Sequence, residues 1–180
     1  MSEDSKKGKG GENPMRGIKV EKVTLNIGAG QAGQVLENAK NLLKKLTGRT
    51  PAVTTSHGRN PVFKLRKGDT IGAKVTLRRG AATAFLKKAF ETVGNQISAR
   101  SFDRAGNFSF GIREYIDFPG VKYDPQIGMM GFDVCVTLGR TGGKRVKVRR
   151  RAQARPRGSY ALTKEEAMEF VKKMFEIELV

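Results

Sequence analysis

The stretch IGAKVTLRR, residues 71–79, decides the fold class because its polar and apolar residues alternate without a break. One phase is apolar and the other is polar or cationic: Ala73, Val75 and Leu77 against Lys74, Thr76 and Arg78. Successive side chains of a strand point to opposite faces of a sheet. The stretch is therefore predicted to be a strand with one buried face and one polar face.

The same alternation recurs in VEKVTLNI (20–27) and FDVCVTL (132–138), and a short strand is expected at AVTT (52–55). The first of these places Lys22, Thr24 and Asn26 on the polar phase. Apolar residues at helical spacing predict helices over 39–46 and 82–93, each followed by a glycine. A capping box, Thr163-x-x-Glu166, predicts the start of a last helix. Its expected inner stripe is Ala167, Phe170, Val171 and Met174.

The order strand, helix, strand, strand, helix, strand predicts an α+β fold of the ferredoxin-like or RRM-like split βαβ kind. Helices then cover one face of the sheet and leave an RNA-binding face opposite. Residues 1–17 are expected to form a flexible tail, and residues 18–180 a single domain that includes a basic arm at 139–158. Within 95–130 only NFSFGI has strand-like alternation, so the path of this segment is not predicted.

The charge balance points to a polyanionic partner. Lys and Arg number 35 against 17 Asp and Glu, so the net charge is +18. Nucleic acid is the favoured partner and an anionic membrane surface the weaker alternative. No apolar run is long enough to span a bilayer, and the N-terminus lacks a secretory apolar segment. One cysteine excludes an intramolecular disulfide and fits a reducing cytoplasm.

A glycine pattern supplies the main rival hypothesis. Gly28, Gly30 and Gly33 satisfy the G-x-G-x-x-G spacing of a dinucleotide-binding turn. That turn also needs an acid about 20 residues later, and RTPAVTTSH (49–57) has none. An NADP variant could use Arg49, but the later parallel strands are missing from the pattern. A tight strand-to-helix turn is the favoured interpretation, and no cofactor is expected.

Other enzymatic hypotheses are weaker. His57 is the only histidine and lies in a basic loop, where a solvated or RNA-facing imidazole is expected. Cys135 has no second cysteine for a zinc site and is expected to be a packed, inert thiol. No catalytic residues and no metal site are predicted.

The polar phases of the first and third strands predict the RNA-binding surface. These six residues, Lys22, Thr24, Asn26, Lys74, Thr76 and Arg78, include no acid and no aromatic side chain. Cations meet phosphates, and Thr and Asn can bond 2′-hydroxyls and base edges. A single-strand reader would instead expose aromatic rings for stacking. The surface is therefore expected to bind structured RNA through its backbone and minor groove.

The arm at 139–158 carries nine cations and no acid, and it is expected to lie between RNA phosphates. The nine are Arg140, Lys144, Arg145, Lys147, Arg149, Arg150, Arg151, Arg155 and Arg157. A free-standing RNA chaperone that acts through this arm is a second alternative.

A dense, ordered set of motifs from about residue 15 to 140 resembles the L5 family of large-subunit ribosomal proteins. The motifs are VTLNIGAG, TGRTPAVTTS, VFKLRKGDTIGAKVTLRRG, SFDRAGNFSFGI and GMMGFDVCVTLGR. The ending LTKEEAMEFVKKMF is similar to the archaeal and eukaryotic branch, and the short N-terminal tail departs from bacterial members. The resemblance implies a structural, non-catalytic protein of the cytoplasmic ribosome. It would bind 5S rRNA in the central protuberance, beside 23S-type rRNA and the 5S binder L18.

The resemblance also assigns residues. Asn26, Thr76 and Arg78 match family positions that contact 5S rRNA, and Arg49 stands where bacterial members have Gln. The expected 5S rRNA site adds four residues to these: Lys22, Thr24, Thr54 and Lys74. The loop SHGRNPVFKLRKG matches a segment that family members extend toward P-site tRNA. Its expected tRNA-facing residues are His57, Arg59, Asn60, Phe63, Lys64 and Arg66. A bridge to a small-subunit head protein is implied without residues.

Overall fold

The computed structural model describes residues 16–30, 33–141 and 161–180. Its centre is a five-stranded antiparallel sheet with the order β2-β3-β1-β6-β5. The strands are β1 (Ile18–Gly28), β2 (Ala52–Thr55), β3 (Thr70–Leu77), β5 (Phe108–Ile112) and β6 (Phe132–Arg140). The segments 1–15, 31–32 and 142–160 lie outside the described residues, and with them most of the predicted tail.

The topology confirms the predicted split βαβ fold. Strand β3 lies between β1 and β2, and β1 lies between β3 and β6, with every neighbouring pair antiparallel. The helix between β1 and β2 therefore joins two parallel strands that are separated by β3, and β3 and β6 are likewise parallel with β1 between them. Strand β5 extends this core as an extra edge paired with β6. Within the described residues, this sheet has no adjacent parallel strands, which a dinucleotide-binding fold requires, so its topology contradicts that alternative for the glycine turn.

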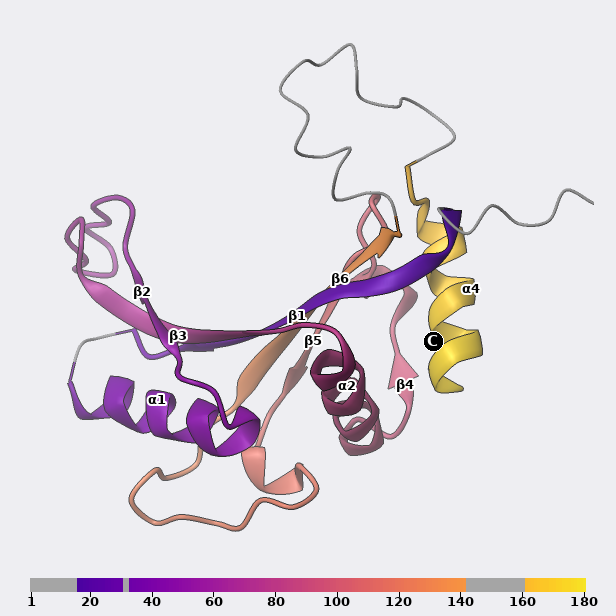
Figure 1. The fold of residues 1–180 in the computed structure, drawn as a ribbon. Coiled ribbons are helices and arrows are strands. Elements are labelled where there is room, and N and C mark those ends of the chain that lie inside the picture. Colours follow the sequence, from indigo (N-terminus) through magenta and orange to yellow (C-terminus); the bar gives the residue numbers. More distant parts are fainter. Residues whose placement is uncertain (1–15, 31–32, 142–160) are drawn as a thin grey trace, which may run out of the picture.

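Helices α1 (Gln34–Thr47) and α2 (Gly80–Thr92) lie on the same face of the sheet, as Figure 1 shows. Three residues of the predicted apolar stripe of α1, Ala39, Leu42 and Leu43, are fully inaccessible, and the fourth, Leu46, is partly buried. The helix ends at Gly48, which adopts the left-handed conformation and donates its N–H to the Lys44 carbonyl. Each buried leucine contributes about 1.5–3 kcal/mol relative to an exposed one. This apolar stripe fixes which side of the sheet α1 covers.

Aromatic contacts join α2 to β5 and to the C-terminal helix α4 (Lys164–Phe175). The ring of Phe90 lies 5.4 Å from that of Phe110 and 5.0 Å from that of Phe175. Phe85 stacks on Phe118 with centroids 4.9 Å apart, which holds the segment 113–131 on the helical side of the sheet. The path of this segment was not predicted because its apolar residues follow no regular spacing.

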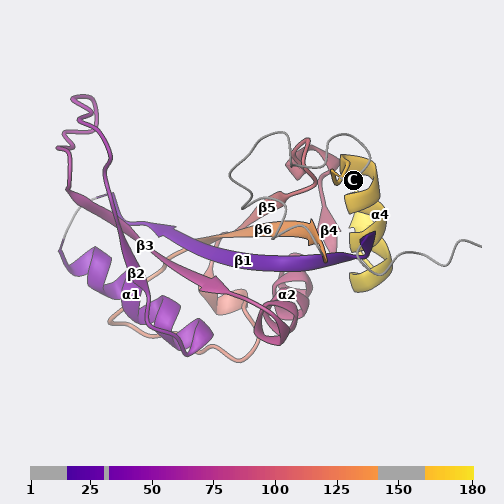
Figure 2. The same cartoon turned by 45° about the horizontal axis from the view of Figure 1, so that its top comes forward.

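Helix α4 begins with the predicted capping box: Thr163 Oγ1 accepts from the Glu166 N–H, and Glu166 accepts from the Thr163 N–H. Ala167 and Val171 are buried as predicted, but the prediction for Met174 was wrong, since it is 43% exposed. The helix lies at the end of the sheet (Figure 2). Ala167 and Val171 are its buried residues. The chain then forms β7 (Glu178–Leu179), paired in parallel with β4 (Gln96–Ile97). Within the described residues, no helix has the length and apolarity to cross a membrane.

Candidate RNA interface

The sheet face opposite α1 and α2, here called the open face, is covered by neither of these helices (Figure 1). Its residues stand in transverse rows because directly paired residues of antiparallel strands share a face. One row runs Ala52, Lys74, Asn26, Asp133, Gly111 across all five strands, and the next runs Thr76, Thr24, Cys135, Ser109. Lys22 and Thr137 follow, at a bulge in β1. The structure thus brings the predicted outward residues of β1 and β3 together.

The β1–β3 half and the β5–β6 half of the open face differ in charge and in side-chain size. Strands β1 and β3 contribute Lys22 and Lys74, and Arg78 follows directly after β3 as an exposed residue. Thr24, Asn26 and Thr76 between them are half-buried by their neighbours. Strands β5 and β6 contribute Ser109, Gly111, Asp133, Cys135 and Thr137. The cations therefore lie on one half of the face and the single acid of these rows on the other.

The β6 half of this face was missed in the sequence, although its signal was present. The alternation in FDVCVTL that buries Val134 and Val136 turns Asp133, Cys135 and Thr137 outward. The prediction of a packed Cys135 was wrong, because the thiol is exposed on the open face. Partial burial, and secondly the Asp133 carboxylate, raise the pKa of the Cys135 thiol, so it is protonated at neutral pH.

No aromatic side chain belongs to these rows of the described sheet. Phe108 and Phe110 on β5 take the inward phase and contact Phe90 of α2 instead. Bases therefore have no aromatic platform in the rows, which distinguishes the face from that of a single-strand reader. Lysine, threonine and asparagine side chains can instead contact phosphates, 2′-hydroxyls and base edges.

The loop between β2 and β3 rises from one end of the sheet, away from α1, in both Figure 1 and Figure 2. Its base is closed by backbone hydrogen bonds between Ser56 and residues 68 and 69, and its tip by a bridge between Asn60 and Leu65. Val62 and Phe63 at the tip are 83% and 71% exposed. Of the predicted tRNA-facing side chains, Asn60 is half-buried. The other five are exposed: His57, Arg59, Phe63, Lys64 and Arg66.

Two further predicted contacts lie at the β2 edge of the sheet. Thr54 is half-buried on β2, and its hydroxyl lies beside Gly72 of β3. Arg49 follows the C-terminal glycine of α1 and is exposed. At the other end of the helix, Gly30 and Gly33 both have positive φ angles of 71° and 128°, which explains these glycines as turn residues.

Arg140 occupies a different place from the arm to which the sequence assigned it. It is the last residue of β6, and its side chain is 9% exposed. The guanidinium donates to both carboxylate oxygens of Glu166, at 2.8 and 3.1 Å, and to the Arg16 carbonyl at 2.8 Å. These bonds join the start of β1, the end of β6 and the start of α4. The other eight predicted arm cations, Lys144, Arg145, Lys147, Arg149, Arg150, Arg151, Arg155 and Arg157, lie outside the described residues.

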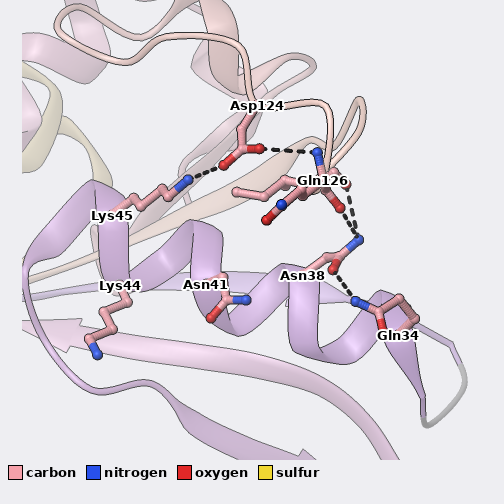
Figure 3. A pocket seen from close by; sticks show the side chains of 8 residues that line it. Gln34, Asn38, Asn41, Lys44, Lys45, Asp124 and Gln126 are labelled. Atoms are coloured by element: carbon pink, nitrogen blue, oxygen red, sulfur yellow. Dashed lines mark hydrogen bonds and ion pairs between the residues drawn. The ribbon is translucent and has the colours of Figure 1, made fainter.

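A polar hollow on the helical side, between α1 and the segment 113–131, is shown in Figure 3. Asn38 donates to the carbonyls of Gln126 and Ile127 and accepts from Gln34. Lys45 forms an ion pair with Asp124, which holds the pKa of that carboxyl below its ordinary value. Several polar groups of the hollow thus bond each other. These bonds attach the segment 113–131 to α1.

No group of His, Cys, Asp and Glu side chains in the described part of the chain could hold a metal ion. The open face has instead the donors and acceptors that suit an extended polar ligand. Its cations, hydroxyls and amide lie on adjacent strands, and the loop and Arg49 add positive charge at its edge.

Comparisons with known proteins cover almost the whole chain. Residues 13–66 match the family model described as ribosomal protein L5, and residues 70–170 match the model of the C-terminus of the same ribosomal family. The large ribosomal subunit protein uL5 of Sulfurisphaera tokodaii is 47% identical over 168 residues, which cover 93% of this chain and 95% of that protein. The protein of that name from Cenarchaeum symbiosum is 46% identical over 92% of this chain and 98% of its own length. That from Methanococcus maripaludis is 43% identical over 94% of both chains.

Proposed function

Because the chain belongs to the ribosomal protein L5 family, it is a structural constituent of the large ribosomal subunit and not an enzyme, and we propose that it binds 5S rRNA through its open face. One observation carries this proposal. Lys22, Thr24 and Asn26 stand in register beside Lys74 and Thr76 on the sheet face that α1 and α2 leave uncovered. Their spacing across two strands suits the phosphates and 2′-hydroxyls of one RNA helix.

The proposed contacts extend beyond these residues of β1 and β3. Arg78, Arg49 and Thr54 lie at the β2–β3 side and enlarge the 5S rRNA surface. The eight cations between residues 144 and 157 supply further contacts to 5S or 23S-type rRNA. Arg140 precedes these cations at the end of β6, where its ion pair with Glu166 holds the strand end against α4. This surface anchors 5S rRNA in the central protuberance, next to L18.

The loop from Ser56 to Asp69 is proposed to reach P-site tRNA. Its hydrogen-bonded base and bridged tip make it a stiff projection. The exposed Phe63 belongs to the same loop as Arg59, Lys64 and Arg66, so a base or ribose can pack on the ring while the cations meet phosphates. The proposed contact to a small-subunit head protein has no residues assigned to it.

The salt dependence of 5S rRNA binding tests the proposal. Each phosphate contact that is lost lowers the slope of log K against log salt by about 0.9. Lys74→Ala and Arg78→Ala should each weaken binding and lower the slope by that amount. The matched control is Lys87→Ala, an exposed lysine of α2 on the covered side of the sheet. Equal slopes for wild type, Lys74→Ala and Arg78→Ala would overturn the assignment of the open face.

A further inference from the structure

A hollow of about 530 Å³ indents the open face at the ends of β1, β5 and β6. It is lined by Asn26, Gly28, Gly111, Arg113, Gly131 and Asp133, together with neighbouring backbone. Within the described residues, no hydrogen bond or ion pair engages the side chains of Asn26, Arg113 and Asp133. This distinguishes it from the hollow beside α1, where Asn38, Lys45 and Asp124 already have partners. Here three hydrogen-bonding side chains remain available to a ligand.

Two glycines of this hollow have no explanation within the fold. Gly28 and Gly111 lie in strands, and neither has a positive φ angle. A Cβ at Gly28 would meet no atom within 4 Å, and one at Gly111 only the Asp133 Oδ1 at 3.5 Å. Gly131 differs, since a Cβ there would lie 2.6 Å from the Arg113 carbonyl oxygen. Glycine weakens a strand and often marks the close approach of a ligand. The bare backbone at 28 and 111 is therefore the second sign of a binding site.

The carboxylate of Asp133 indicates which chemical groups a ligand in this hollow would present. An acid on this face repels phosphate, and Lys74 of the same row is two strands away, about 10 Å. A carboxylate only accepts hydrogen bonds, and its two oxygens can accept a parallel pair. On the Watson–Crick edge, guanine offers two adjacent donors, N1–H and the N2 amine, whereas adenine and cytosine each offer one amine. Single-stranded bases are commonly recognised along this edge.

We propose that the hollow receives an unpaired guanine of the bound RNA, with Asp133 accepting hydrogen bonds from its N1 and N2. The backbone at Gly28 and Gly111 lies against the base, and Asn26 and Arg113 supply donors for O6 or an adjoining phosphate. The guanine site rests on the proposal that the open face binds RNA. It adds base recognition to a surface that otherwise contacts the RNA backbone.

The test is chemical probing of 5S rRNA in complex with the full chain. Kethoxal, which modifies unpaired guanine at N1 and N2, should fail to modify at least one guanine that is reactive in free 5S rRNA. In complexes with Asp133→Asn that guanine should regain its reactivity, since an amide cannot accept from both donors. Gly28→Ala should do the same by filling the hollow, and it should fold because its Cβ meets open space. Gly80→Ala, at the start of α2 and also without neighbours, is the control.

The direction in which Asp133→Asn changes the affinity for RNA provides a second test. Asp133→Asn removes one negative charge, so it would strengthen RNA binding if Asp133 were a bystander. The guanine site predicts the opposite, a loss of about tenfold or more, which is the value of one good bidentate base contact. Asp117→Asn makes the same charge change at an exposed site on the helical side and should not weaken binding.

The outcomes separate the two proposals. If no 5S rRNA complex forms, or it forms unchanged when Lys74 and Arg78 are replaced, the open face is not the RNA-binding surface and both fail. If the complex depends on those cations but Asp133→Asn leaves the guanines equally protected, the guanine site alone is overturned. Gly28-dependent protection of adenine or cytosine from dimethyl sulfate, in place of guanine, would also overturn it.

Discussion

Replacement of Glu166 by glutamine should destabilise the fold more than any other single amide substitution on α4. The glutamine would keep the length and the capping interaction with Thr163, since the N3 position of a capping box accepts either residue. It removes only the negative charge opposite Arg140, whose side chain is 9% exposed. The guanidinium would then lose its carboxylate partner on α4 while it keeps the bond to the Arg16 carbonyl.

The magnitude follows from how the two partners are buried. Removing one member of a fully buried ion pair costs about 3–5 kcal/mol, and an exposed pair is worth about 0–1 kcal/mol. The Arg140 side chain is largely buried but that of Glu166 is 44% exposed, so water screens part of the interaction. A loss of about 2 kcal/mol is expected, close to the value of one hydrogen bond to a charged group. For a chain of this size, that lowers the Tm by roughly 4–8 °C.

The pH dependence of this stability difference gives an independent prediction. The hydrogen bond from the Thr163 N–H, and then Arg140, lower the pKa of Glu166, and partial burial opposes them. A carboxyl whose pKa is depressed by folding stabilises the fold above its ordinary value of 4.5 and loses this contribution as the pH falls through the folded pKa. The stability difference between wild type and Glu166→Gln should therefore be largest at neutral pH and shrink in acid.

Urea unfolding of the full chain, followed by circular dichroism at about pH 7 and at a pH about one unit below the ordinary carboxyl pKa, measures both effects. Glu165→Gln is the matched control, because Glu165 lies on the same turn, is exposed, and forms no ion pair within the described residues. Equal unfolding midpoints for the two variants at neutral pH would refute the anchoring role of the Arg140–Glu166 pair. If the stability difference between wild type and Glu166→Gln stayed constant as the pH falls, the charge of Glu166 would be refuted as its cause.

Three other predictions concern the sheet, the core and the arm. Gly72→Ala should destabilise the fold in urea unfolding, because a Cβ there would lie 2.5 Å from the Ile27 carbonyl oxygen and 2.9 Å from Thr54 Oγ1; a stability equal to wild type would contradict that packing. Phe90→Ala should cost about 3–5 kcal/mol, since the ring is 1% exposed and contacts three other aromatic rings; a loss below about 1 kcal/mol would show that the cluster repacks. Deletion of 145–151 should weaken binding to 5S and 23S-type rRNA alike and lower the salt slope, whereas native affinity at moderate salt would assign the arm to another role.

The sequence predicted the elements whose pattern is local. The alternation around Val75 and Val134 and the apolar spacing of α1 and α2 each had one strong period, and burial followed it. The order of these elements was enough to predict the split βαβ sheet. The prediction of the capping box of α4 was also correct, because Thr163 and Glu166 lie only three positions apart in the sequence.

The features that were missed depend on contacts between distant parts of the chain. Arg140 precedes a cationic run and resembles part of it, and only the position of α4 shows its pairing with Glu166. Met174 fits the helical stripe of α4, but that helix presents too narrow a face to the core to bury it. The hollow beside Asp133 requires three strands to be in register, so no single stretch of sequence predicts it.

Cys135 offers the most direct test of the open face as the RNA-binding surface. It is the only cysteine of the chain, it is exposed, and its row includes Thr24 and Thr76. Its alkylation rate by a small maleimide should be measured with and without saturating 5S rRNA, and complex formation confirmed on the same samples by gel shift. Binding through the open face predicts that the complex slows alkylation strongly. An unchanged rate in a fully formed complex would contradict it.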